Sequence, residues 1–368
     1  MKKALILTLL LVGLVVLAGC GSTSTSTEDT IKIGTYLALT GGIASYGQAE
    51  LAGIELAVQE YNANGGINGQ QIELIVEDDM TGPESVDAVQ KLITIDQVIA
   101  LIGPTGSASA GPSTPIVQNY EIPNILLTAS APDLTYIGDY IFRVYPSDSF
   151  QGKEAASFMK EDYDKVAVVY VKNDWGQGIK DVFIDEFENL GGEVVYESGV
   201  LQEETDFKTE IEKITATDAE ALYFAVYPNN AVSGFKQMEE YNFDLPIIGG
   251  DTLMGTEVTA SGYGDGTIFI VSKLDFPDDF AAKINAMEGY EDLDVNFGAS
   301  LGYDAANILF EAIESAGTNN EAIRDALKET SYAGVSSPHI SFDEAGDIAD
   351  TEYEYYMISN GESVPYFK

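Results

Sequence analysis

The stretch that decides the fold is residues 97–107, which reads Gln97-Val98-Ile99-Ala100-Leu101-Ile102-Gly103-Pro104-Thr105-Gly106-Ser107. Its first part, Val98 to Ile102, is a short apolar run that Gly103 and Pro104 interrupt, and this is typical of a buried strand that ends in a loop. A helical pattern follows and ends near Tyr120. An apolar strand followed by a loop and a helix is the repeating unit of a parallel sheet covered by helices.

The same unit recurs along most of the chain. The spacing of apolar residues predicts a first set of strands at 31–37, 71–76, 98–102 and 124–127, with helices at 48–62 and 83–93 and the one that ends near 120. After 143–146 the pattern restarts, with strands at 166–171, 194–196, 221–226 and 246–248 and helices at 177–190, 207–214 and 231–241. The fold class is therefore α/β with mostly parallel sheets.

The two halves resemble each other, which predicts two α/β lobes with a cleft between them. Ligands of such sheets bind beyond the carboxyl ends of the strands. Two helices at 301–316 and 320–329 and two strand-like segments at 339–342 and 353–358 are expected to complete the lobes. The predicted domains are a signal peptide at 1–20, a flexible tether at 21–30, lobe 1 at 31–147 plus 276–337, and lobe 2 at 148–275 plus 338–368.

The N-terminus has the pattern of an export signal. Lys2 and Lys3 precede an apolar run that ends at Ala18, and this run is shorter than the roughly 20 apolar residues that cross a bilayer. The sequence Leu17-Ala18-Gly19-Cys20 resembles the lipobox of prokaryotic lipoproteins, whose cysteine is lipidated. A plain signal peptide is the alternative. Cys20 is the only cysteine of the chain, and lipidation gives it a role.

Composition limits the classes of partner and of chemistry. The chain has 60 Asp and Glu against 18 Lys and Arg, a net charge of −42, and such a surface repels nucleic acid. Its single histidine, His339, and the lack of clustered Cys or His give no basis for a Ser-His-Asp triad or for a zinc site. We therefore expect no enzyme, no metal and no cofactor.

Several motifs together resemble the branched-chain amino-acid binding proteins of ABC transporters. In order, the motifs are Ile31-Lys32-Ile33-Gly34, Leu39-Thr40-Gly41, Tyr46-Gly47, residues 62–69 (NANGGING), Ile102-Gly103-Pro104, Phe142-Arg143-Val144, Gln151-Gly152, Trp175-Gly176, Tyr227-Pro228, Gly249-Gly250-Asp251 and Phe342-Asp343. The resemblance covers nearly the whole chain after the tether. It implies the type I periplasmic binding protein fold, in which two Rossmann-like lobes are joined by three crossovers and grip a ligand. The cysteine pair that family members often carry is absent.

The resemblance also implies a set of ligand contacts. An amino acid taken out of water needs a partner for its carboxylate and another for its ammonium. By family position Ser107 holds the carboxylate beside Thr105 and Gly106, and Thr128, Ala129 and Ser130 contact both groups. Asp251 matches the acidic residue that pairs with the ammonium. For Ser107 and Asp251, a helix-capping role is the alternative.

Three aromatic residues match positions that contact the ligand side chain, namely Tyr46, Trp175 and Tyr227. We expect Trp175 on an exposed polar loop that faces the cleft, although simple packing is the alternative for each ring. The resemblance implies an extracytoplasmic lipoprotein, expected to be a monomer, that delivers a branched-chain or small apolar amino acid to an ABC transporter permease. The alternatives are a binder of amides, urea or aromatic acids, a ligand-sensing lipoprotein, and a lipid-anchored hydrolase.

Overall fold

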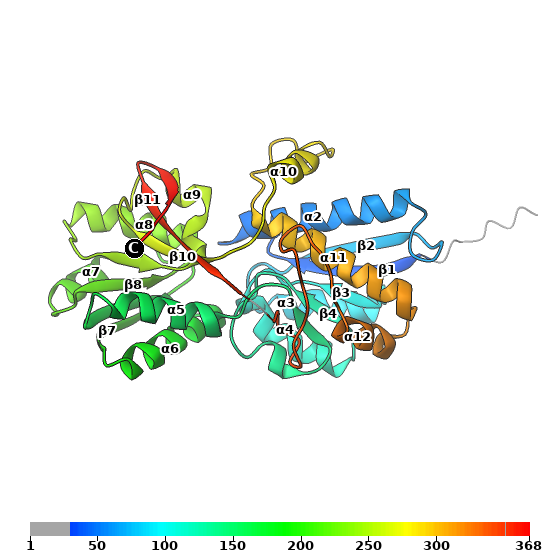
Figure 1. Ribbon diagram of the computed structural model, residues 1–368, viewed down its shortest axis with the longest axis horizontal. Coiled ribbons are helices and arrows are strands. Elements are labelled where there is room, and N and C mark those ends of the chain that lie inside the picture. Colours follow the sequence, from blue (N-terminus) through cyan, green and yellow to red (C-terminus); the bar gives the residue numbers. More distant parts are fainter. Residues whose placement is uncertain (1–29, 350) are drawn as a thin grey trace, which may run out of the picture.

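A computed structural model describes residues 30–349 and 351–368, and these form two α/β lobes that lie side by side (Figure 1). The predicted signal peptide with Cys20, and residues 21–29 of the predicted tether, lie outside the described residues. Each lobe has its own sheet, so the prediction of an α/β chain with two mostly parallel sheets is confirmed.

Lobe 1 has a five-stranded parallel sheet with the strand order β2-β1-β3-β4-β5. Its strands are β1 (Ile31–Leu37), β2 (Ile72–Asp78), β3 (Ala100–Ile102), β4 (Asn124–Leu126) and β5 (Ile141–Arg143). Its helices are α2 (Ala44–Ala63), α3 (Ser85–Lys91), η1 (Leu92–Asp96), α4 (Ser107–Asn119), η2 (Thr135–Ile137), α10 (Asp278–Asn285), α11 (Phe297–Ala316) and α12 (Asn320–Lys328).

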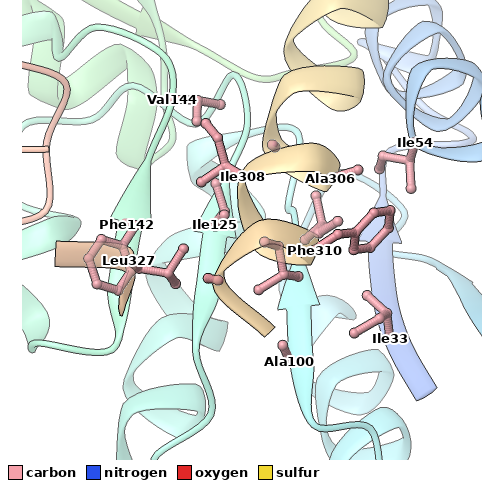
Figure 2. Close-up of a cluster of buried hydrophobic side chains, with 14 of the residues drawn as sticks. Ile33, Ile54, Ala100, Ile125, Phe142, Val144, Ala306, Ile308, Phe310 and Leu327 are labelled. Carbon is pink, nitrogen blue, oxygen red and sulfur yellow. The ribbon is translucent and has the colours of Figure 1, made fainter. Parts of the chain in front are cut away.

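Successive residues of the central strands of lobe 1 point to opposite faces of the sheet, and helices cover both faces. Ile102 and Ile125 enter a core with α2, α11 and α12. Figure 2 shows Ile125 near Ile308 of α11 in this core. Their neighbours Leu101 and Leu126 enter a second core with α3 and α4. This two-sided burial explains why these strands read as continuous apolar runs in the sequence.

Two glycines let α2 and α11 pack against each other at close range. A Cβ atom on Gly53 of α2 would lie 1.9 Å from the carbonyl oxygen of Ala299, and one on Gly302 of α11 would lie 2.2 Å from the carbonyl oxygen of Glu50. Real Cβ atoms do not approach an oxygen so closely. The close contact holds Glu50 of α2 deep inside lobe 1, where its side chain is fully buried.

Lobe 2 has a seven-stranded sheet with the order β12-β11-β10-β9-β8-β6-β7, in which β11 is antiparallel to both of its neighbours. Its strands are β6 (Lys165–Val171), β7 (Glu193–Val200), β8 (Ala221–Ala225), β9 (Ile247–Gly249), β10 (Ile268–Ser272), β11 (Tyr353–Ser359) and β12 (Glu362–Pro365). Its helices are α5 (Asp148–Lys160), α6 (Asp174–Asn189), α7 (Lys208–Thr215), α8 (Pro228–Glu240), η3 (Asp251–Met254) and α9 (Thr256–Thr259).

The C-terminal part of the chain differs from the sequence prediction. Residues 338–349, predicted in lobe 2, belong to lobe 1, because Ile340, Phe342 and Ile348 are buried in the core beneath α11. The predicted strand at 339–342 is also wrong, since this segment forms only isolated bridges to Tyr332 and Ile348. We therefore place the last crossing to lobe 2 after residue 349. The strand predicted at 353–358 is confirmed as β11.

Candidate functional site

A cavity with an empty volume of about 430 Å³, part of it open to solvent, lies between the two lobes. Most of its wall follows the carboxyl ends of parallel strands, where ligands of such sheets bind. The lining residues are Ile43, Tyr46, Thr105, Gly106, Ser107, Thr128, Ser130, Tyr145, Trp175, Tyr227, Asp251, Thr252 and Phe297.

The structure brings together all the predicted ligand-contact residues except one. Ala129 is not among the residues that line the cavity. Its carbonyl oxygen instead accepts a hydrogen bond of 3.1 Å from Nη1 of Arg143, a fully buried side chain that also pairs with Asp347. Ala129 therefore does not contact the cavity, and its hydrogen bond to Arg143 helps to hold the loop between β4 and η2 in place.

The anion-binding end predicted for the cavity lies at the start of α4. The loop from β3 reaches this helix through a cis peptide bond between Gly103 and Pro104, and α4 begins at Ser107. The first N–H groups of a helix have no partner within the helix and carry partial positive charge. Oγ of Ser107 accepts a 3.0 Å hydrogen bond from the N–H of Ala131, which leaves its own O–H free to donate to an anion.

Two threonines of the wall are tied to a buried acid that the sequence analysis missed. Thr105 Oγ1 donates to Oε2 of Glu50 at 2.5 Å, and Thr128 Oγ1 donates to Oε1 at 2.8 Å. Burial raises the pKa of the Glu50 carboxyl from 4.5 to about 8, against the lowering effect of these hydrogen bonds. Glu50 therefore fixes the positions of both threonine side chains.

Asp251 supplies the carboxylate of the cavity wall. It is the first residue of η3, separated from the end of β9 by Gly250 alone, and only 8% of its surface is exposed. The hydroxyl of Tyr145 donates a hydrogen bond to its Oδ2. Burial raises the pKa of Asp251 above the usual range of an aspartate, while the bond from Tyr145 lowers it. A buried carboxylate without a cationic partner is costly, so the position suits a ligand that brings a positive charge.

Aromatic rings form the rest of the wall. Trp175 and Tyr227 stack with ring centroids 5.2 Å apart, and Tyr46 packs against Phe297 at 5.6 Å. The prediction of an exposed Trp175 on a loop is wrong: it lies in the first turn of α6, whose N-cap is Asn173, and only 4% of it is exposed. The polar loop sequence before it is the helix cap, which explains the misreading.

A second cavity, with an empty volume of about 960 Å³, shares Tyr46, Tyr145, Asp251 and Phe297 with the first. Hydrogen bonds cross between the lobes around these cavities: Ser45 donates to Glu257 at 3.0 Å, Thr256 donates to Asp294, and Gln202 donates to the carbonyl oxygen of Thr81 at 3.2 Å. The lobes are therefore closed on each other in this structure.

Four lining residues were missed in the sequence. Tyr145 follows β5, whose apolar run is interrupted by the buried but charged Arg143. Thr252 adjoins Asp251 and could have been found from it, and its hydroxyl donates to the carbonyl oxygen of Val226 at 2.8 Å. Ile43 and Phe297 carry no chemical signal that distinguishes them from core residues.

The described part of the chain offers little to a metal ion or a bilayer. Within residues 30–349 and 351–368, no three His, Cys, Asp or Glu side chains are grouped so that they could bind a metal. Over the same residues, no helix combines the length and the apolar composition that spanning a membrane requires.

Comparison with known proteins agrees with this geometry. The leucine-, isoleucine-, valine-, threonine- and alanine-binding protein of Pseudomonas aeruginosa is 29% identical over 348 residues, which is 92% of each chain. A leucine binding protein from Thermotoga maritima has a TM-score of 0.81 at 25% identity, covering 92% of this chain and 98% of that one. The branched-chain amino-acid transporter substrate binding protein of Streptococcus pneumoniae, solved with isoleucine, has a TM-score of 0.78 at 29% identity, covering 91% and 99%.

A family model described as periplasmic binding protein matches residues 30–361, which is almost all of the described chain. This match agrees with the two-lobed fold and with the cavity at the strand ends. The family predicted from the sequence motifs is therefore confirmed. The chain belongs to the periplasmic binding protein family.

Proposed function

We propose that this protein captures an α-amino acid with a branched-chain or small apolar side chain and delivers it to the permease of an ABC transporter. The observation that carries the proposal is the make-up of one cavity, which combines the buried carboxyl of Asp251, a helix that starts at Ser107, and the stacked rings of Trp175 and Tyr227. An amino acid brings a cation, an anion and a side chain, and each has a counterpart in this wall.

In this proposal each end of the cavity has a distinct task. The hydroxyl of Ser107 and the first N–H groups of α4 bind the ligand carboxylate, beside Thr105 and Gly106. Asp251 pairs with the ammonium. Thr128 and Ser130 contact both the ammonium and the carboxylate. Tyr46, Trp175 and Tyr227 contact the side chain. The names of the similar proteins support a small or branched aliphatic side chain. The Pseudomonas protein is named for binding leucine, isoleucine, valine, threonine and alanine, the Thermotoga protein is named for binding leucine, and the Streptococcus protein was solved with isoleucine.

Calorimetry with three ligands tests the proposal on the protein without residues 1–20. The ligands are leucine, 4-methylpentanoate, which is leucine without its amine, and 3-methylbutylamine, which is leucine without its carboxylate. We expect leucine to bind most tightly by at least about tenfold over either fragment, since each charged contact contributes more than about 1.4 kcal/mol. Tighter binding of 4-methylpentanoate, or of an amide, would contradict the proposal.

We also propose that a lipid on Cys20 anchors the protein on the outer face of the cell membrane. The lipobox-like sequence supports the anchor, and an anchored protein has a raised local concentration at the permease. Cell fractionation with a Cys20→Ser variant tests this. The natural chain is expected in the membrane fraction and the variant in the soluble one, and a membrane-bound variant would refute the anchor.

A further inference from the structure

Asp148 lies directly behind the cavity wall and is bonded to it through Ser130. It begins α5, and only 1% of its surface is exposed. Ser130 Oγ donates to Oδ2 of Asp148 at 2.8 Å, and the N–H of Asp148 donates to the carbonyl oxygen of Ser130, also at 2.8 Å. Ser130 lines the cavity, whereas Asp148 does not. Any effect of Asp148 on a ligand therefore passes through Ser130 or through its charge.

A serine hydroxyl has one hydrogen, so its direction decides what the oxygen offers to a ligand. When Asp148 is ionised, Ser130 gives its hydrogen to the carboxylate and presents only oxygen lone pairs to the cavity. When Asp148 is protonated on Oδ2, the carboxyl donates to Ser130 instead, and the serine hydrogen is free to point into the cavity. The first state suits an ammonium and the second a carboxylate.

We propose that Asp148 is a positioning residue that sets the hydrogen-bond direction of Ser130 and so makes the cavity select a ligand with a protonated amine over a plain carboxylate. The inference rests on the proposed function, because it assigns Ser130 to the amine side of an amino acid. Binding of the amino acid then requires the ionised form of Asp148 and releases the proton to solvent.

The groups around Asp148 set its pKa within the pH range in which binding can be measured. The titratable and charged groups that face it from other elements are Arg143 on β5, Tyr223 on β8, Tyr227 before α8, Asp251 in η3 and Tyr353 on β11. Burial and the like charge of Asp251 raise the pKa of Asp148 to about 8, and the Ser130 hydrogen bond and Arg143 lower it. Arg143 offers little compensation, because it already pairs with Asp347 at 2.6 Å.

The pH dependence of selectivity tests this role. The affinities for leucine and for 4-methylpentanoate are measured by calorimetry between about pH 6 and about pH 8. For each proton released on binding, leucine affinity rises by about tenfold per pH unit below the pKa of the group that loses it. The affinity for 4-methylpentanoate is expected to fall over the same range. The ratio of the two affinities is therefore expected to rise steeply with pH.

The Ser130→Ala variant separates hydrogen-bond direction from simple charge, since it keeps the Asp148 carboxyl and removes the hydroxyl. The slope is the factor by which the ratio of leucine affinity to 4-methylpentanoate affinity rises per pH unit. We expect this factor to be about ten times smaller in Ser130→Ala than in the natural protein. The Ser130→Thr variant keeps a hydroxyl and is expected to restore the slope. A matched control is Asp304→Asn, which changes a buried carboxyl bonded to Ser336, away from the cavity, and leaves the slope unchanged.

The slopes of the natural protein and of the two Ser130 variants decide whether Asp148 has this positioning role. A reduced slope in Ser130→Ala with recovery in Ser130→Thr supports the inference. A natural slope in Ser130→Ala, or a ratio that is flat in the natural protein, overturns the inference but leaves the proposed function standing. Failure of leucine to bind at any pH overturns both. If Ser130→Ala does not fold, Ser130→Gly replaces it, since it also keeps the Asp148 carboxyl and removes the hydroxyl, and the same loss of slope is required.

Discussion

Replacing Glu50 by glutamine is expected to change how the stability of the fold depends on pH. The Glu50 carboxyl is fully buried, and its pKa rises from 4.5 to about 8 in the folded chain. Between these two values the folded protein holds a proton that the unfolded chain has lost. The free energy of unfolding therefore falls as pH rises through this window, and the effect is complete above about pH 8.

The size of the effect follows from the shift. A change of one pKa unit corresponds to about 1.4 kcal/mol, so the rise from 4.5 to about 8 corresponds to a loss of about 5 kcal/mol across the window. Glutamine has nearly the same shape and stays neutral at every pH. Glu50→Gln is therefore expected to gain stability relative to the natural protein as pH rises, by up to about 5 kcal/mol.

Urea denaturation at about pH 5, pH 6.5 and pH 8.5 measures this difference. Comparing the two proteins at each pH removes the contribution of the other buried acids, such as Asp79 and Asp148, which titrate in both. A difference in unfolding free energy that stays constant with pH would refute the reasoning. A difference that grows in favour of the natural protein as pH rises would refute it as well.

Three other predictions follow from the fold and the composition. Gly53→Ala is expected to destabilise the protein by about 1–3 kcal/mol, because the new Cβ would lie 1.9 Å from the carbonyl oxygen of Ala299. An unchanged melting temperature would show that α2 and α11 can move apart without loss of stability. Leucine is expected to change the fluorescence of Trp175, the only tryptophan, since it lines the cavity; an unchanged spectrum at saturation would place the ligand elsewhere. Adding salt is expected to raise the melting temperature because it screens a net charge of −42, and a decrease would contradict this.

The elements that could be predicted from the sequence are those whose burial is two-sided and continuous. The strands β6 and β8 are buried over nearly all their length, so they read as uninterrupted apolar runs. The strand β5 ends in the charged Arg143, so it does not read as an uninterrupted apolar run. The apolar side chains at 340–348 are buried in lobe 1 without forming a strand, so their pattern gave both a wrong element and a wrong lobe.

Site residues that stand in a family motif could be predicted from the sequence, whereas those brought to the site only by tertiary packing could not. Ser107 and Asp251 stand in recognisable motifs after strands, and the structure places both at the cavity. Glu50 lies in the middle of a helix, between residues that face the core, and its link to Thr105 depends on how α2 packs against the sheet. Phe297 comes from a segment far along the chain, and only the folded lobe brings it to Tyr46.

The most direct test of the central claim compares leucine and 4-methylpentanoate on the natural protein and on Asp251→Asn by calorimetry. If Asp251 pairs with the ammonium, leucine binding is expected to weaken by about 2–5 kcal/mol in the variant. Binding of 4-methylpentanoate, which has no amine, is expected to stay the same or improve. An equal loss for both ligands, or an unchanged affinity for leucine, would contradict the account.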